Sequence, residues 1–392
     1  MPTLPFAAYP GHVDFSSTEE LRRNVAAIMV EQVIRGLTVQ PGEVKLPSEP
    51  SARDIVFKGT FEEVNRFFYN REWSDGLPVV PPTIEKIKEF LRYTGRNADE
   101  VIGVFLPDNR ESTIWNVAVN GVMAGCRPEY MPVLIAMIEV MADPKFGQEH
   151  LGQTPGTEVL VTVNGPVIKA LGFNYEQGAL RVGYQANTSI GRFWRLYLRN
   201  VAGFLPHKTD KGCFGGTWRV VLAENEDAAA KIGWTSLGVD RGFSTTDSVV
   251  TVSSCTERLQ ALGVGAAKAE DVLDKISDRI MDAQLFLSRL RAFIGNVCPT
   301  VIMSPCVAEA IAKAGYTKEM VRQYFFEHTK FRVKPGEQLG QELKDSDAEV
   351  PLVLSPEDFL IIVSGDPGRD HCLICAQNGM IGYPVSKKIE MQ

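Results

Sequence analysis

Cys126 is the residue whose position most clearly suggests chemistry. The stretch 112–126 is expected to form a helix that ends at Gly125, and Pro128 is expected in the first turn of the next helix. A thiol at a helix N-terminus faces unpaired backbone N–H groups, and with the neighbouring cation of Arg127 these favour the reactive thiolate. Cys126 is therefore a candidate nucleophile or acid–base group. The alternative is a small thiol that fills a tight corner between two helices.

Arg192 and Arg195 are candidates for holding an anion. They lie three residues apart and share one face of the helix expected over 189–201. Asn187 or Thr188 can cap this helix, whose free N–H groups then form an anion cradle. The guanidinium fork matches a carboxylate or a phosphate. We expect Asn187, Thr188 and Arg192 to bind a small anionic substrate, the alternative being a solvated basic face.

Other candidate binding residues follow expected strands, where ligands bind in open α/β sheets. Asn164 and Gly165 follow the strand expected over 158–163, and a glycine there allows close backbone approach. Asp366 and Gly368 lie in a glycine-containing loop after a later strand. All four are predicted to contact substrate, although Asn164-Gly165 could equally form a simple turn.

Further candidates are a histidine and three cysteines. His207 lies in a glycine-flanked loop and is the first candidate to transfer protons, since histidine titrates near neutral pH. Cys306 is expected in the first turn of a helix, where the thiolate is favoured or a small residue is simply buried. Cys372-x-x-Cys375 could be a redox pair or half of a metal site. Only His371 joins it locally, so no metal site is predicted.

Composition excludes several classes of protein. The chain has 392 residues, a net charge of −7 and no long basic run, which excludes a typical nucleic-acid binder. No apolar run is long enough for a membrane span, and no signal peptide is recognisable. Seven scattered cysteines do not form a disulfide framework, so a cytoplasmic protein with reduced thiols is expected. Phosphate-binding and dinucleotide-binding glycine motifs are absent, and no cofactor is evident.

The pattern of apolar residues and turns predicts an α/β fold. We expect mixed, partly parallel sheets flanked by helices, in two α/β domains that follow an N-terminal helical arm. The expected boundaries are 1–58 for the arm and linker, 59–265 for the domain with Cys126 and the Asn187–Arg192 motif, and 266–392 for a C-terminal Rossmann-like domain. The arm helix suggests packing on another subunit and hence a homo-oligomer.

Five segments carry a resemblance to known proteins: 75–83, 120–130, 163–166, 186–192 and 382–389. They resemble bacterial proteins of the UGSC family of selenoproteins and their cysteine relatives. The resemblance extends from about residue 70 onward and implies a cytoplasmic bacterial protein with thiol or selenol chemistry. The family's Asp-(Sec or Cys)-Gly-Ser-Cys signature is absent, and Pro367 stands where a redox residue would be expected. This departure disfavours selenol-type chemistry and leaves Cys126, inside a matching segment, as the better nucleophile.

Together these features predict a cysteine-dependent enzyme that cleaves a bond in a small carboxylate-bearing metabolite by lyase or hydrolase chemistry. Cys126 would be the nucleophile or acid–base group, Arg192 would hold the carboxylate and His207 would move protons. Backbone N–H groups near Gly165 would stabilise a developing oxyanion. The alternatives are a thiol–disulfide redox protein that uses Cys372 and Cys375, or a non-catalytic subunit that binds the same small anion.

Overall fold

The computed structural model describes residues 6–39, 50–216, 219–290, 295–333 and 348–391. The chain divides into two compact units, Met1–Val56 and Phe57–Gln392. The expected fold class is confirmed, because mixed sheets with parallel pairs are flanked by helices and an N-terminal helix precedes them.

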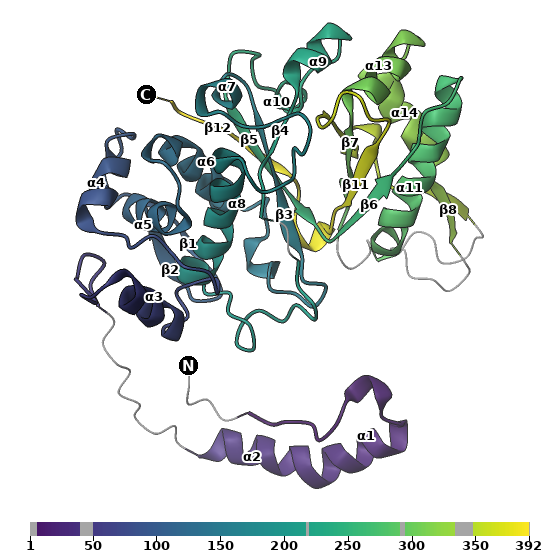
Figure 1. Ribbon diagram of the computed structural model, residues 1–392. Helices are drawn as coiled ribbons and strands as arrows, with labels where there is room; N and C mark the ends of the chain where they lie inside the picture. The colour runs from purple at the N-terminus through teal and green to yellow at the C-terminus, as the bar shows by residue number, and fades with distance from the viewer. Residues whose placement is uncertain (1–5, 40–49, 217–218, 291–294, 334–347, 392) are drawn as a thin grey trace. The chain divides into compact units, whose positions relative to one another are not determined.

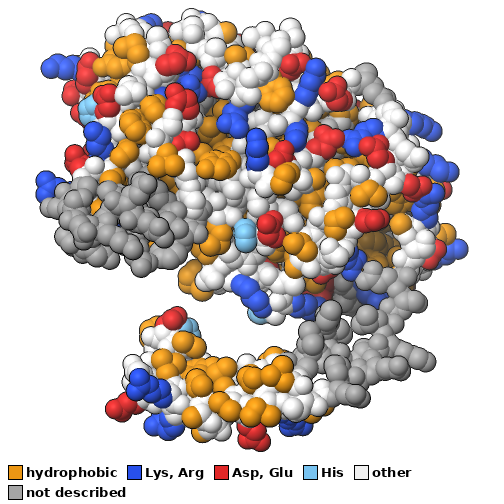
Figure 2. Space-filling model, turned by 180° about the vertical axis from the view of Figure 1, so that it is seen from behind, with side chains coloured by type: hydrophobic (Ala, Val, Ile, Leu, Met, Phe, Trp, Pro, Cys, Tyr) orange, Lys and Arg blue, Asp and Glu red, His pale blue; other side chains and the backbone are white. Residues whose placement is uncertain are grey.

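The first unit contains a helical run with an apolar surface. α1 (Thr18–Asn24), a π-turn over 25–29 and α2 (Val30–Thr38) follow one another. The Ser17 hydroxyl caps the run by accepting a hydrogen bond from the Glu20 N–H at 3.2 Å. Figure 2 shows apolar side chains along this run, and the exposed ones are Val25, Ile28, Val30, Val33, Ile34 and Leu37. A helix with so much exposed apolar surface is typical of one that packs against a partner.

The second unit alternates helices and strands (Figure 1). Its helices are α3 (Phe61–Asn70), α4 (Ile84–Leu91), α5 (Ile114–Ala124), α6 (Met131–Ala142), α7 (Val167–Leu171), α8 (Gln185–Tyr197), α9 (Glu226–Lys231), α10 (Leu237–Asp240), α11 (Ala269–Arg289), α13 (Pro305–Lys313) and α14 (Lys318–His328). Its strands are β1 (Val101–Phe105), β2 (Arg110–Thr113), β3 (Glu158–Asn164), β4 (Leu222–Ala223), β5 (Val249–Cys255), β6 (Glu257–Ala261), β7 (Thr300–Met303), β8 (Lys330–Val333), β9 (Ala348–Pro351), β10 (Leu360–Val363), β11 (Cys372–Ala376) and β12 (Val385–Lys388).

Two four-stranded sheets form the centre of this unit, as far as the described residues go. The strand order is β12-β5-β3-β4 in the first sheet and β10-β7-β11-β6 in the second. β3 is parallel to β4 and β10 is parallel to β7, whereas the other neighbours are antiparallel. The second sheet thus differs from the mostly parallel sheet of the expected Rossmann-like domain. The β1–β2 and β8–β9 pairs form separate antiparallel ladders.

The two sheets pack against each other through alternate side chains of their strands. Leu160, Ile302 and Ile362 belong to an apolar cluster between the sheets. Their neighbours Val161 and Val363 belong to two other clusters, one on the outer face of each sheet. In Figure 1, α5, α6 and α8 lie beside the first sheet, and α11, α13 and α14 lie beside the second. The order of layers is therefore helix, sheet, sheet, helix.

The chain crosses between the sheets twice. After β5 of the first sheet it continues through Thr256 into β6 of the second, and after β11 of the second it returns to β12 of the first. The crossing segments meet where the Thr256 N–H donates to the Ala376 carbonyl at 2.9 Å. The sheets therefore do not separate at residue 265, the expected boundary, because long-range strand pairing overrides the order of the chain.

A leucine pair tests the layer between the sheets. Leu222 is fully buried there, whereas Leu262 is 61% exposed. Leu222→Ala should lower the free energy of unfolding by about 3 kcal/mol, because it removes buried methyl groups and leaves a cavity. Leu262→Ala is the matched control and should change it by less than about 0.5 kcal/mol. Urea unfolding of both variants measures the difference, and equal effects would contradict a packed layer between the sheets.

Candidate functional site

Cys126 closes a helix rather than opening one. Gly125 has a left-handed backbone (φ 79°), and the Cys126 N–H donates to the Gly121 carbonyl at 3.0 Å, which completes a Schellman cap on α5. The next helical turn begins at Pro128, with Arg127 as its N-cap. The thiol is buried with its residue 9% exposed, and burial raises its pKa to about 12. This corrects the expectation of a thiolate at a helix N-terminus, because the thiol is protonated at neutral pH.

The first half of α8 faces Cys126. Burial raises the pKa of the thiol, while a hydrogen bond with the Ser189 side chain and the charge of Arg192 partly oppose that shift. The Gln185 side-chain amide donates to the Gly125 carbonyl at 3.3 Å. The fold thus brings the charge of Arg192 near the thiol.

Arg192 holds a carboxylate of the protein itself. Its Nε and Nη2 donate to the two oxygens of Asp75 at 3.1 and 2.8 Å, and Nη2 also donates to the Pro78 carbonyl at 2.9 Å. Arg219 donates to the same carboxylate from Nη1 at 3.0 Å. Burial acts to raise the pKa of Asp75, but the bonds and charges of the two arginines outweigh it and hold the pKa below its usual value. This corrects the expected open anion clamp at Arg192.

Asn187 and Thr188 lie inside α8, which begins at Gln185. The Asn187 amide accepts from the Asn174 N–H at 2.9 Å and donates to the Asn174 and Val221 carbonyls, both at 2.9 Å. The Thr188 hydroxyl accepts from the Gly183 N–H at 3.2 Å. Both side chains therefore hold neighbouring backbone instead of capping the helix, and the expected cradle of free N–H groups at Asn187 is corrected.

A row of arginines continues along α8 and into the π-helical turn Leu198–Ala202 that follows it. Arg195 pairs with Glu158, the first residue of β3, at 2.9 Å, and Arg199 donates to the Glu72 carbonyl at 2.5 Å. Glu158 is buried, and burial raises its pKa to about 7, although the charges of Arg195 and Arg219 act to lower it. A carboxyl that titrates near neutral pH in a buried charged site is a functional candidate. Glu158 was not among the candidates predicted from the sequence. The signal that could have found it is an acidic residue at the start of an otherwise apolar strand.

These groups form one connected set, which we name the α8 network. Asp75 bonds both Arg192, beside the thiol, and Arg219, whose charge also acts on Glu158. The side chain of Arg219 is 38% exposed, so the network reaches solvent through a cation. The α8 network comprises Asp75, Cys126, Glu158, Ser189, Arg192, Arg195 and Arg219.

Asn164 and Gly165 have a different role, at the far end of β3. The Asn164 amide donates to Glu224 at 2.7 Å and to Glu226 at 3.1 Å, and the Gly165 N–H donates to Glu226 at 3.0 Å. Because this N–H is occupied, the expected oxyanion donor near Gly165 is corrected. Glu224 is completely buried, which raises its pKa, and it also accepts from the Leu237 N–H at 2.7 Å.

The remaining candidates are spread over other parts of the unit. His207 is exposed with φ 67°, and Lys208 beside it pairs with Glu72 at the Arg199 end of the row, away from Cys126. The Asp366 carboxylate accepts from the Gly368 N–H at 2.8 Å, so it stabilises its own turn. The expected proton carrier is thus not brought to Cys126.

The three other cysteine candidates lie in the second sheet or in α13, the helix that follows its strand β7. Cys306 is half-buried in the first turn of α13. Cys372 and Cys375 lie in β11, and they point to opposite faces because side chains three apart in a strand alternate. A disulfide between them is sterically excluded without rearrangement, which argues against the alternative of a Cys372–Cys375 redox pair.

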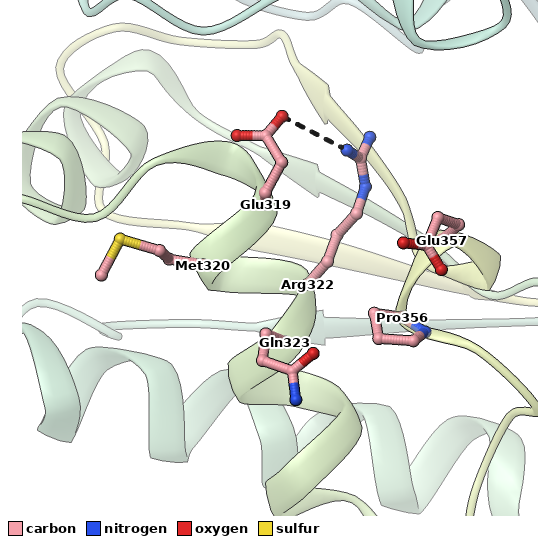
Figure 3. Close-up of a pocket in the computed structure, with 6 residues that line it drawn as sticks. All are labelled: Glu319, Met320, Arg322, Gln323, Pro356 and Glu357. Atoms are coloured by element: carbon pink, nitrogen blue, oxygen red, sulfur yellow. Dashed lines mark ion pairs between the residues drawn. The ribbon is translucent and has the colours of Figure 1, made fainter.

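A surface pocket of about 360 Å³ lies apart from these groups (Figure 3). It is formed by α14 and the turn at 356–358. Arg322 in its wall pairs with Asp240 at 2.5 Å and with Glu319 at 3.9 Å, so its charge is already compensated. The lining residues are Glu319, Met320, Arg322, Gln323, Pro356 and Glu357, none of which was a candidate from the sequence.

Metal binding and membrane crossing both require particular groupings of residues, which the described residues lack. No group of three or more His, Cys, Asp or Glu side chains there is arranged to hold a metal ion. None of the helices in the described ranges combines the length and apolar character that crossing a membrane requires.

Comparisons with protein-family models, with curated proteins and with solved structures found no match to this chain.

The burial of Cys126 predicts the order of thiol alkylation. Cys213 is exposed and Cys306 is half-buried, whereas Cys126 is buried with a pKa of about 12. Iodoacetamide reacts with thiolates, so Cys213 and Cys306 should be labelled first and Cys126 only after unfolding. Mass spectrometry of the separate cysteine peptides measures the order. Labelling of native Cys126 as fast as Cys213 at pH 7 would contradict its burial as a neutral thiol.

Glu158 predicts a pH dependence of stability. Its folded pKa of about 7 lies above the ordinary 4.5, so the folded state holds a proton that the unfolded state releases between these values. The proton on Glu158 adds about 3 kcal/mol to the free energy of unfolding below pH 4.5, and this stabilisation is lost as the pH rises to 7. The free energy of unfolding, measured with urea, should be lower at pH 7.5 than at pH 5, and Glu158→Gln should remove this difference. The exposed Glu62→Gln serves as the control and should keep the difference, and an unaltered pH profile in Glu158→Gln would refute the assignment.

Proposed function

We propose that this protein is an enzyme that cleaves a bond in a small carboxylate-bearing metabolite at the α8 network. Cys126 is the reacting thiol, Arg219 binds the substrate carboxylate and Glu158 transfers protons. The observation that carries the proposal is one connected set of groups, from segments far apart in the chain, that contains a buried thiol, a partly exposed guanidinium and a carboxyl whose pKa burial raises to about 7.

The meeting of three matching segments supports the placement of the site. The segments 75–83, 120–130 and 186–192 are joined by the Arg192–Asp75 pair, by the Val80 N–H that donates to the Met123 carbonyl at 3.3 Å and by the contact of Ser189 with Cys126. We propose on these segments that the chain is a relative of the UGSC family that lacks the family's redox signature.

Arg219 is the better binding group for the substrate. The guanidinium of Arg192 donates its hydrogen bonds to Asp75 and to two backbone carbonyls. It therefore orients Asp75 and adds positive charge near the thiol. Arg219 donates one hydrogen bond to Asp75 from Nη1, and its side chain is partly exposed. An anion can therefore reach it without displacing an internal pair. Cation and thiol belong to one small region, because Asp75 bonds both arginines.

Glu158 replaces His207 as the proposed proton carrier. With a pKa of about 7 it is present in both protonation states near neutral pH, which suits a general acid–base group. Gly216 lies directly against it, since a Cβ added there would collide with the Glu158 side chain. The glycine-rich chain around 210–216 thus covers the carboxyl, and a small displacement of it would admit substrate.

The state of Cys126 sets its proposed chemistry. A thiol with a pKa of about 12 must lose its proton before it attacks substrate, and the cation of Arg192 is placed to stabilise the thiolate. A specific observation also favours a second candidate, a non-catalytic subunit that binds the same anion. A neutral, buried thiol that completes a helix cap is what a purely structural cysteine provides.

Substitution of Arg219 tests the binding site. Small mono- and dicarboxylates are first screened by their effect on the melting temperature of the full chain and by direct detection of products. For a carboxylate that binds, Arg219→Gln should weaken binding at least about tenfold, because it removes a charge-assisted hydrogen bond, and Arg219→Lys should restore part of it. Arg332→Gln, at an exposed position of β8, is the matched control and should bind normally. Unchanged affinity in Arg219→Gln would exclude this site.

Cys126→Ser separates the two candidate functions. Loss of turnover with binding and fold intact supports the enzyme. Turnover that persists excludes Cys126 as the reacting group, and binding without turnover in the wild-type chain supports the binding subunit.

A further inference from the structure

Cys306 is a partly accessible thiol at the carboxyl end of β7. It is the second residue of α13, after the N-cap Ser304 and Pro305. Its thiol donates to the Arg369 carbonyl at 3.0 Å and lies 3.5 Å from the Ser304 hydroxyl. Cys306 is half-buried, so small oxidants can reach its sulfur while its position stays fixed by these contacts.

Cys372 lies beside Cys306 on the same face of the second sheet. In the β11–β7 ladder Cys372 is paired with Met303, and both side chains belong to the apolar cluster beneath α11, α13 and α14. Cys306 packs against that same cluster, three residues beyond Met303. The Ser304 N–H donates to the His371 carbonyl at 3.1 Å, which fixes the two backbones together next to both cysteines.

The electrostatics of the two thiols agree with this proximity. Burial raises the pKa of Cys372, and a negative charge on the neighbouring Cys306 raises that pKa further. Cys375, on the opposite face of β11, instead forms a thiol contact with Cys255 in the buried layer between the sheets. Strand alternation therefore gives Cys372 and Cys375 different partners, and of these four cysteines Cys306 is the least buried.

We propose that Cys306 and Cys372 are an oxidant-sensitive thiol pair that forms a reversible disulfide on reaction with hydroperoxides. The Cys306 sulfur takes the terminal oxygen of the hydroperoxide, the O–O bond breaks, and the thiol proton leaves with the resulting alcohol or water. Cys306 is then a sulfenic acid. The Cys372 sulfur attacks it, the S–O bond breaks and water leaves, so two thiols are oxidised as one hydroperoxide is reduced.

The disulfide would change the loop that follows β10. The reduced Cys306 thiol anchors this loop through the Arg369 carbonyl, and a disulfide has no S–H to donate. Oxidation therefore removes a bond that holds the segment 366–371. The inference concerns the second sheet and does not depend on the function proposed for the α8 network.

Peptide mapping of the full-length protein tests the pair. The reduced protein is treated with hydrogen peroxide, free thiols are blocked with N-ethylmaleimide, and disulfide-linked peptides are identified by mass spectrometry before and after dithiothreitol. The expected result is a Cys306–Cys372 linkage that dithiothreitol reverses. Cys306→Ser should abolish the linkage, and Cys372→Ser should leave a Cys306 sulfenic acid that dimedone traps.

Cys375→Ser is the matched control, since it lies on the same strand but faces away, and it should leave the linkage intact. Circular dichroism checks that each variant is folded. If a variant does not fold, the disulfide map of the wild-type protein by itself tests the proposal. The proposal is overturned if Cys306 proceeds to a sulfinic acid while Cys372 stays reduced, if only Cys255 and Cys375 become linked, or if oxidation is confined to exposed Cys213.

Discussion

The buried carboxylate of Glu224 is the interaction on which the arrangement of the two sheets depends. It accepts hydrogen bonds from the Asn164 amide of β3, from the Leu237 N–H and from the Val363 N–H of β10, so it joins both sheets. A buried carboxyl without such donors would cost several kcal/mol, so the sheets must stay in register to keep them. The apolar layer between the sheets is thereby aligned, and Asn164, a candidate for substrate binding, is used for structure.

One strand transmits this constraint to the α8 network. β3 ends at Asn164, which bonds Glu224, and begins at Glu158, which pairs with Arg195. Its register against β5 fixes which face each residue occupies, since a shift by one residue would turn every side chain to the other face. The position of Glu158 among arginines therefore follows from the pairing of a whole strand. The same burial that stabilises the strand raises the pKa of its first carboxyl.

The reactive groups lie in two separate regions, one defined by charge pairing around α8 and the other by the alternation of side chains along β11. Around α8, arginines and carboxylates compensate each other, and only Arg219 keeps substantial exposure among the pairs with Asp75. In the second sheet, the alternation of β11 separates Cys372 from Cys375 and directs Cys372 toward Cys306. Cys126 is buried, whereas Cys306 in the same unit is a more accessible thiol. The two proposals are independent because they involve different sheets.

The sequence by itself determined the α/β class, most of the regular elements and the end of α5 at Gly125, because periodicity, caps and glycine conformations are local properties. It also placed Cys126 and Arg192 among the residues of interest, and these two do meet. Only the tertiary structure decided that Asp75 takes the fork of Arg192, that Cys126 is buried and protonated, that Glu158 titrates near pH 7 and that Cys372 lies beside Cys306. Each of these depends on desolvation or on a partner far along the chain, and neither is encoded in the spacing of nearby residues.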